Sequence, residues 1–359
     1  MRNEVISERQ AVVLIIFFIL GSTFLIGSGG QAKQDAWIAV IIAISWSAIL
    51  LLMFSRILSL YPGKDLFDIL QIVMGKFLGK IISIIMIWFA FHLGTLVIRN
   101  LSEFTNAIVL PDTPVVLPML FFIILLVWGL RAGIEVLGRW SEFFIWIVIF
   151  TFIVISTLSI SQMDINRLKP LLKGAFSSFS FPFGETVIFT MVFSNISKAK
   201  NYNKTFMLGL ALGGFIVFLA TIRNLLVLGS GTVSRFYFPS TTATSIVHIG
   251  ELFQRLEMEV TIIFLICTFV KTIICLLAVC NGISKLFGFD DYRFMATPVT
   301  LLMFNFSFVI YKSTMEMSGW AFSTWPYYSM VFEVIIPLVV FIVAEIRSRD
   351  SSSLNVSKQ

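Results

Sequence analysis

Long apolar segments recur along the whole chain, and they limit its fold more than any other feature. A helix needs about 20 predominantly apolar residues to cross the hydrocarbon layer of a bilayer. Ten segments of the 359-residue chain approach or exceed that length. They lie at residues 9–30, 36–59, 79–109, 114–130, 139–160, 174–194, 204–229, 258–284, 294–312 and 325–346. We therefore predict an all-α integral membrane protein with about ten transmembrane helices.

Composition supports a single domain within the lipid bilayer. Apolar residues make up 58% of the chain and charged residues 13%, against about 25% charged residues in ordinary globular proteins. No polar linker divides the apolar segments. We expect one transporter-like membrane domain over residues 9–346, flanked by a cytoplasmic N-terminal tail, 1–8, and a cytoplasmic C-terminal tail, 347–359.

The basic residues predict the orientation of the chain. Lys and Arg are enriched in the cytoplasmic connections of membrane proteins. With the N-terminus inside, sixteen of the 26 basic residues fall on the cytoplasmic side and eight outside, and two lie within membrane segments. Both termini are therefore expected to be cytoplasmic in a multi-pass membrane protein. The net charge of +6 is explained by this topology, and nothing indicates binding to nucleic acid.

The sixth segment, Gly174–Ser194, carries a signal for an interrupted helix. Its middle reads Phe181-Pro182-Phe183-Gly184 and is followed by the carboxylate Glu185. Proline removes a backbone donor and glycine relaxes the backbone, so a continuous helix is disfavoured. Irregular backbone at membrane depth is tolerated only where protein or a water-filled cavity surrounds it, and an ionisable group there indicates a functional site. The alternative is a proline kink whose Glu185 pairs with a neighbouring helix.

The first segment resembles the sixth in having small residues at mid-depth. Gly21-Ser22-Thr23 lies halfway along it, and we expect a second break there. The two segments are five spans apart, so ten helices divide into two sets of five. Because five is odd, the second set has the opposite topology, which is a 5+5 inverted repeat with broken helices 1 and 6 at a central site.

Few polar groups lie within the apolar segments. Arg99 and Glu103, four residues apart on one helix face, are expected to form a structural clasp. Lys271 has Glu185 as its most attractive counter-ion, and such a pair could also be purely structural. His92 is more typical of a hydrogen-bonded packing residue, and Arg223 is expected to extend outward to the membrane surface. Glu333 of the tenth segment completes the set.

The two breaks indicate what would bind between them. Free N–H groups near Ser22 and Thr23 favour a carboxylate, and freed carbonyls from Phe181 to Gly184 favour an ammonium or hydroxyl donor. Together they describe a small zwitterion such as an amino acid, although a nucleoside or sugar could use the same groups. The predicted ligand-binding residues are Gly21, Ser22, Thr23, His92, Phe181, Phe183, Gly184, Glu185 and Lys271.

No chemistry-bearing constellation is visible beyond this site. Cys267, Cys275 and Cys280 lack metal-ligand spacing and are expected to be buried free thiols. No nucleophile–base arrangement or phosphate-binding loop occurs, so neither an enzyme, a metal nor a cofactor is predicted. The connection at 235–257 is either a lid over the outer mouth or an amphipathic helix at the interface.

Five short motifs in the connections and the sixth segment are characteristic in their order and spacing. They are Tyr61-Pro62-Gly63-Lys64, Gly75-Lys76-Phe77-Leu78-Gly79-Lys80, Leu110-Pro111-Asp112-Thr113-Pro114, Pro182-Phe183-Gly184-Glu185, and Phe238-Pro239 followed by Arg255-Leu256-Glu257. With them the chain resembles, over about residues 8–348, the endospore germination permease family. These are the B subunits of nutrient germinant receptors.

The resemblance implies both a fold and a cellular role. The fold would be that of the amino acid–polyamine–organocation transporter superfamily, with the first-helix break at Gly21, Ser22 and Thr23 and the sixth-helix break at Phe183, Gly184 and Glu185. The protein would lie in the spore inner membrane beside an A subunit and a lipoprotein C subunit. It would sense a small nutrient there. An ion- or proton-coupled amino-acid permease is the alternative.

Overall fold

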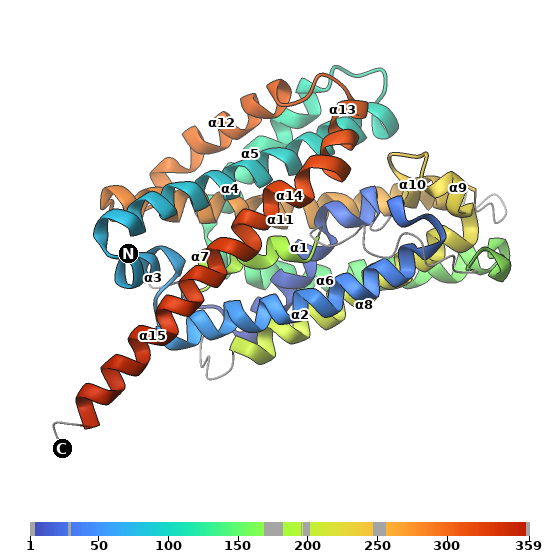
Figure 1. Ribbon diagram of the computed structural model, residues 1–359. Coiled ribbons are helices and arrows are strands. Elements are labelled where there is room, and N and C mark those ends of the chain that lie inside the picture. The colour runs from blue at the N-terminus through green and yellow to red at the C-terminus, as the bar shows by residue number, and fades with distance from the viewer. Residues whose placement is uncertain are drawn as a thin grey trace.

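The chain forms a bundle in which the axes of the long helices are roughly aligned (Figure 1). The computed structural model describes residues 4–27, 30–168, 182–194, 196, 202–246 and 256–356. Outside the helices, this part of the chain contains turns, connections and one isolated parallel bridge between Ile6 and Ile196. The all-helical class predicted from the apolar segments is confirmed.

Six helices of the described residues are long and apolar enough to cross a membrane, and two shorter helices are also apolar. The long ones are built on α2 (Ala36–Leu60), α4 (Lys76–Phe104) with its π-helical extension η2 (Thr105–Val109), α6 (Ile134–Leu158) with η3 (Ser159–Gln162), α8 (Tyr202–Leu228), α11 (Leu256–Phe287), and the C-terminal helix from α13 (Thr314–Gly319) to α15 (Ile336–Val356). The short ones are α5 (Val116–Ala132) and α12 (Ala296–Val309), which η6 (Arg293–Met295) precedes. Each falls on a predicted segment.

The first predicted segment forms α1 (Glu8–Ile26), a continuous α-helix in the centre of the bundle. A capping box starts it: Ser7 Oγ accepts from the Gln10 N–H at 3.1 Å, and Gln10 Oε1 accepts from the Ser7 N–H at 2.9 Å. It ends at Gly27, whose φ of 76° is accessible to glycine. Its buried side chains pack against α8, α11 and α6.

The predicted break at Gly21-Ser22-Thr23 is therefore wrong. The α1 helix passes through these residues, and Thr23 Oγ1 donates a hydrogen bond to the Ile19 carbonyl one turn earlier. Without a proline, small residues leave the backbone donors and the helical hydrogen bonds in place. The backbone N–H groups near Ser22 and Thr23 are consequently not exposed by a helix break.

The described part of the sixth segment does not form a spanning helix, as predicted. Pro182 and Phe183 form a turn, followed by the 3-10 helix η5 (Gly184–Ile188) and the single-turn helix α7 (Phe189–Val192). The chain leaves helical geometry at Phe193. Residues 169–181, which include Phe181 and the first part of the predicted segment, lie outside the described residues.

The last predicted segment belongs to a longer helical run, from Thr314 to Val356. It contains α13 (Thr314–Gly319), α14 (Trp325–Met330) and α15 (Ile336–Val356), joined by the π-helical turns η7 (Trp320–Thr324) and η8 (Val331–Ile335). The helix thus continues past residue 346, where the cytoplasmic tail was predicted to begin. In Figure 1 its end projects beyond the rest of the bundle.

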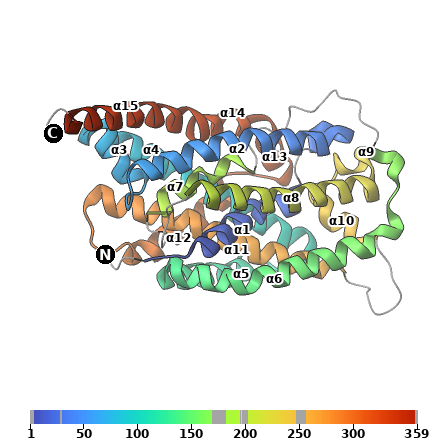
Figure 2. The same cartoon turned by 90° about the horizontal axis from the view of Figure 1, so that it is seen from below.

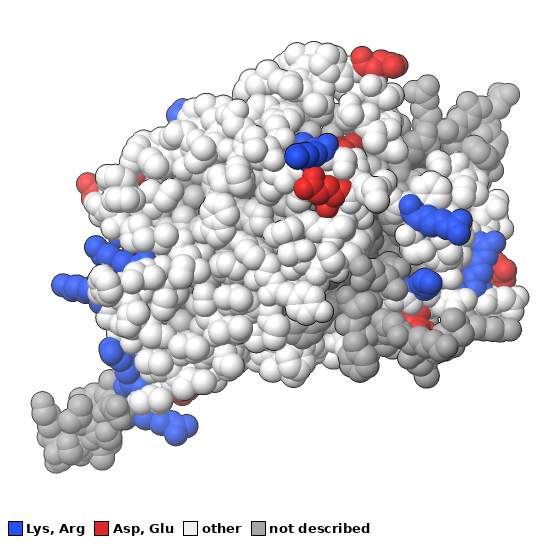
Figure 3. All heavy atoms as spheres, turned by 45° about the horizontal axis from the view of Figure 1, so that its top comes forward, with Lys and Arg blue, Asp and Glu red and all other residues white. Residues whose placement is uncertain are grey.

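The first described residues and the end of α15 lie at the same end of the bundle, as Figures 1 and 2 agree. The short helix α3 (Leu66–Met74) is at this end too. At the opposite end lie α9 (Ser230–Val233) and α10 (Pro239–Ser245), the described helices of the predicted lid; residues 247–255 are outside the description. Charged side chains gather towards the two ends of the face seen in Figure 3, apart from one small group.

Candidate functional site

Glu185 and Lys271 form an ion pair in the middle of the bundle, which we call the core pair. Lys271 Nζ lies 2.5 Å from Glu185 Oε2, and the two side chains are 0% and 1% exposed. Glu185 comes from η5 and Lys271 from the central part of α11. The ammonium group also lies 4.9 Å from the centre of the Phe18 ring of α1, within cation–π range. The predicted pairing of these two residues is confirmed.

Two glycines allow the backbone to approach this pair closely. A Cβ atom on Gly21 would lie 2.6 Å from Lys271 Cδ, so any larger residue here would require the lysine side chain to shift. A Cβ on Gly184 would lie 2.1 Å from Glu333 Oε2. Gly21 and Gly184 were both predicted at the site, and the structure places each in contact with an ionisable side chain.

Glu333 is the residue that sequence reasoning missed at this site. It lies in η8, is 1% exposed, and its carboxylate contacts Gly184, the neighbour of Glu185. The sequence shows it as an acidic residue inside an apolar segment, which is a signal for function. It does not show that the tenth segment packs against the sixth, as η8 does against η5.

His92 belongs to an aromatic cluster beside the core pair rather than to the pair itself. It is buried on α4, its ring stacks on Trp88 with a centroid distance of 5.7 Å, and its Nδ1 lies 3.2 Å from the Tyr328 hydroxyl. That hydroxyl also accepts a hydrogen bond from Trp88 Nε1 at 2.9 Å. The geometry fits the packing role expected of this histidine.

The other predicted site residues are dispersed. Phe183 is fully buried, with its ring edge close to Gly214 of α8. Thr23 lies on the far side of α1 from Lys271 and lines a small hollow against α8 and α10. Ser22 belongs to α1, but its side chain is outside the described part of the chain, as is all of Phe181.

Two expectations for membrane arginines can be compared with the structure. Arg99 forms the predicted clasp with Glu103, at 2.6 Å, and also donates to the Ser307 carbonyl at 3.3 Å. Arg223, which was expected to extend outward, is instead 2% exposed and turned towards Asn224. The prediction for Arg223 is therefore wrong: its guanidinium is buried and donates to the Asn224 side chain at 2.9 Å.

At the N-terminal end of the bundle a second lysine of α11 forms a second ionic cluster. Lys285 Nζ lies 2.7 Å from Asp65 Oδ2 and also contacts Asp68. Asp65 caps α3 by accepting the Asp68 N–H at 3.1 Å. Burial outweighs the attraction of Lys285 and raises the pKa of Asp65 to about 6. These residues line a cavity of about 390 Å³, the inner cavity, which also reaches Asn281 of α11.

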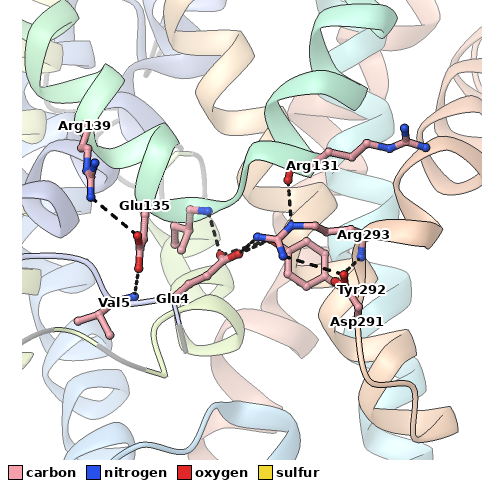
Figure 4. Close-up of polar contacts among 9 residues, drawn as sticks. Glu4, Val5, Arg131, Glu135, Arg139, Asp291, Tyr292 and Arg293 are labelled. Atoms are coloured by element: carbon pink, nitrogen blue, oxygen red, sulfur yellow. Dashed lines mark hydrogen bonds and ion pairs between the residues drawn. The ribbon is translucent and has the colours of Figure 1, made fainter. Parts of the chain in front are cut away.

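The N-terminal segment of residues 4–6 has no strand structure beyond the bridge of Ile6, and its Glu4 lines the inner cavity (Figure 4). The Glu4 carboxylate accepts hydrogen bonds from Arg293 and Tyr292 and, at 3.1 Å, from the Ile134 N–H. The Val5 N–H donates to Glu135 at 2.7 Å. Burial, with the adjacent Glu4 carboxylate, raises the pKa of Tyr292, which therefore remains a donor. Cys267, Cys275 and Cys280 are buried free thiols, as predicted.

A fold of this kind is known among membrane transporters. The solved structure of Mhp1, a nucleobase-cation-symport-1 family transporter in a closed conformation with bromovinylhydantoin bound, superposes with a TM-score of 0.56 and 13% identity. The match covers 85% of this chain and 73% of that one. At this identity the likeness concerns the fold alone, and it defines a multi-pass helical membrane protein with a transporter-like architecture.

The family follows from the sequence comparisons. The model of the spore germination protein family matches residues 5–317, and the chain belongs to this non-enzymatic family of germinant receptor B subunits. Spore germination protein KB of Bacillus subtilis (strain 168) is 29% identical over 356 residues, which cover 96% of this chain and 95% of the relative. Spore germination protein A2 of the same organism is 22% identical, covering 88% and 87%. The predicted family is confirmed.

Proposed function

We propose that this protein is the nutrient-sensing B subunit of a germinant receptor and binds a small nutrient, such as an amino acid, beside the core pair. The observation that carries this proposal is the wholly buried ion pair between the interrupted sixth segment and α11. Ionisable groups at such a depth are costly and mark ligand or ion sites by default. A pair that only held two helices together would be replaceable by apolar residues at little cost.

The charge of the site favours a ligand with an ammonium group. Two carboxyl groups, Glu185 and Glu333, share this part of the core with one ammonium group, Lys271. Carboxyl oxygens accept hydrogen bonds, so an ammonium or hydroxyl donor on the ligand suits this part of the core. This replaces the sequence-based expectation for the carboxylate half of the ligand, because α1 offers no free N–H groups at Ser22 and Thr23.

The remaining features of the proposal concern topology and assembly. Ten spans arranged as an inverted repeat are proposed from the ten predicted segments, and the six long and two shorter apolar helices of the described residues, with the transporter-like fold, support the proposal. Both termini are proposed to be cytoplasmic in a protein of the spore inner membrane, and their position at one end of the bundle supports placing them on the same side of the membrane.

An A subunit and a C subunit are the proposed partners, and they relay the conformational change that follows ligand binding. The ligand shifts the conformational equilibrium only as far as it binds one conformer better.

Germination assays test the proposal. Spores that carry this subunit are exposed to a panel of amino acids, nucleosides and sugars, with Glu185→Gln and Lys271→Ala as variants. We expect both variants to abolish the response to the effective nutrient at normal protein level. Arg139→Gln, at a side chain 75% exposed, is the control and should respond normally. Normal germination of the core-pair variants refutes the assignment. Uptake of labelled amino acid by the purified chain in liposomes, without partners, identifies a permease instead.

A further inference from the structure

The motif from Gly75 to Lys80, with the sequence Gly-Lys-Phe-Leu-Gly-Lys, joins α3 to α4 and has no part in the core pair; we call it the α3–α4 corner. Gly75 links the two helices with a φ of 80°, in a region that favours glycine. A Cβ atom on Gly79 would lie 2.6 Å from the Leu70 carbonyl oxygen, so glycine lets the start of α4 pack closely against the end of α3. The two glycines therefore fix where the other side chains of the corner lie.

The corner exposes large apolar side chains. Phe77 is 79% exposed and Leu78 is 55% exposed. Phe77 begins an exposed row that continues along α4 through Ile81, Ile84 and Trp88. Residues at these spacings share one face of a helix, and α4 is long and apolar enough to cross a membrane. The apolar side chains of the corner are thus continuous with a helix face that suits the acyl chains of lipids.

Two exposed lysines accompany the start of this apolar row. Lys76 and Lys80 are four residues apart, so they are neighbours on the surface of α4. None of the ion pairs in the described part of the chain includes either of them. Lys76 is the first residue of α4, where a positive charge opposes the helix dipole. An anion in contact with the two ammonium groups would offset that unfavourable interaction.

The C-terminal helix places a third basic group beside the corner. Arg347 Nη1 donates to the carbonyl of Ile72, in the last turn of α3, at 2.7 Å. Asp68 of α3 and Glu345 of α15 are both paired with other basic residues. Figure 3 shows basic side chains gathered at the end of the bundle that carries α3. The positive charge of the corner is therefore not balanced by these two carboxylates.

We propose that the α3–α4 corner binds the headgroup of an anionic phospholipid. Phe77 and Leu78 enter the boundary of the acyl chains, while Lys76 and Lys80 bind phosphate oxygens at the level of the membrane surface. The positive charge favours an anionic over a zwitterionic lipid. The exposed apolar side chains favour a lipid over a free anion or an acidic protein segment. Because α3 lines the inner cavity, a bound lipid would also hold one wall of that cavity in place.

Thermal unfolding of the purified full chain in detergent tests this inference. Phosphatidylglycerol is titrated into the micelles and compared with phosphatidylcholine of the same acyl chains and with soluble glycerol phosphate. We expect only phosphatidylglycerol to raise the Tm in a saturable way. The double variant Lys76→Gln/Lys80→Gln should raise the half-saturating amount of this lipid about 30-fold, because each basic residue near an anionic surface contributes about fivefold.

Matched variants separate charge, apolar contact and the general effect of a surface lysine. Lys76→Arg/Lys80→Arg keeps both charges and should bind the lipid as the wild type does. Phe77→Ser should weaken binding about tenfold through the loss of apolar contact. Lys204→Gln removes an exposed lysine from the start of α8 and should leave the titration unchanged. All four side chains are exposed, so these changes do not remove core packing.

Four results would overturn the proposal. Phosphatidylcholine could act as strongly as phosphatidylglycerol, or glycerol phosphate could act equally, which would indicate a site for a free anion. The glutamine double variant could bind phosphatidylglycerol unchanged, or Lys204→Gln could weaken binding as much as the double variant does, which would indicate a general charge effect. None of these results depends on which nutrient the core pair binds.

Discussion

The two lysines of α11 place the same side chain in two different environments. Lys271 and Lys285 are 14 residues apart, so they lie on nearly the same face of the helix and about 21 Å apart along it. Lys271 is 0% exposed and pairs with Glu185 in the core, whereas Lys285 is 18% exposed and shares Asp65 and Asp68 beside the inner cavity.

The difference shows how access to water decides what a buried charge can do. At the inner cavity, Asp65 can take up a proton if Lys285 is lost, because burial already raises the pKa of Asp65 to about 6. In the core, by contrast, the side chains of Lys271 and Glu185 are 0% and 1% exposed. Charge there must be balanced by the protein or by a ligand, and this is why we place the nutrient at Lys271 rather than at Lys285.

Replacing each lysine by methionine tests this contrast most strongly. Lys271→Met leaves Glu185 buried without its ammonium partner, so we expect the free energy of unfolding to fall by about 3–5 kcal/mol. Lys285→Met at pH 5 should cost about 1 kcal/mol or less, because Asp65 can take up a proton. Chemical or thermal unfolding of the purified proteins in detergent measures both effects.

The rescue of Lys271→Met separates charge from packing. Adding Glu185→Gln removes the buried carboxylate, and most of the lost stability should return. If the double variant is as unstable as Lys271→Met alone, the lysine acts through its contacts with Gly21 and Phe18, and the contrast between the two lysines is one of packing.

The sequence predicted the interruption of the sixth segment because proline has a local effect. Pro182 cannot donate a backbone hydrogen bond, whatever surrounds it. The first segment was mispredicted because glycine has no such fixed effect. Gly21 serves close packing against Lys271, a residue 250 positions later in the chain, and only the tertiary structure shows whether a glycine bends a helix or lets another one approach.

The candidate site was predictable to the extent that charges in an apolar chain must find partners. Lys271 and Glu185 could be matched on that ground, as could Arg99 and Glu103 by their spacing. Glu333 and Arg223 could not be placed, because their surroundings depend on which helices pack together. The contact of η8 with η5 joins segments far apart in the sequence, and the burial of Arg223 is a property of the packed bundle.

The pH dependence of stability sharpens the account of the inner cavity. The pKa of Asp65 is raised from its ordinary value of 3.8 to about 6 in the folded protein. Between these values the folded state holds the proton more tightly than the unfolded state, so the free energy of unfolding should fall as the pH rises from about 4 to 6. The loss is at most about 3 kcal/mol, and it is measured as the Tm across this range.

Asp65→Asn is the matched variant, because asparagine also caps helices and carries no titrating proton. It should flatten the dependence on pH in this window while Lys285 keeps Asp68. A wild-type Tm that rises from pH 4 to 6 would show that Lys285, and not burial, dominates the titration of Asp65. Asp65 would then need Lys285 as a charged partner, as Glu185 needs Lys271 in the core pair.

The smallest expected effect concerns the packing that surrounds the core pair. In Gly184→Ala the added methyl group would overlap the Glu333 carboxylate, at 2.1 Å from Oε2, and we expect a cost of about 1–3 kcal/mol. Gly319→Ala is the control, since nothing lies within 4 Å of its Cβ position and alanine favours the helix by about 0.5–1 kcal/mol. Glu333→Ala in the Gly184→Ala background should restore part of the loss, which thermal unfolding can measure. If Gly184→Ala is as harmless as Gly319→Ala, the Glu333 side chain can move aside and the packing around Gly184 is not tight.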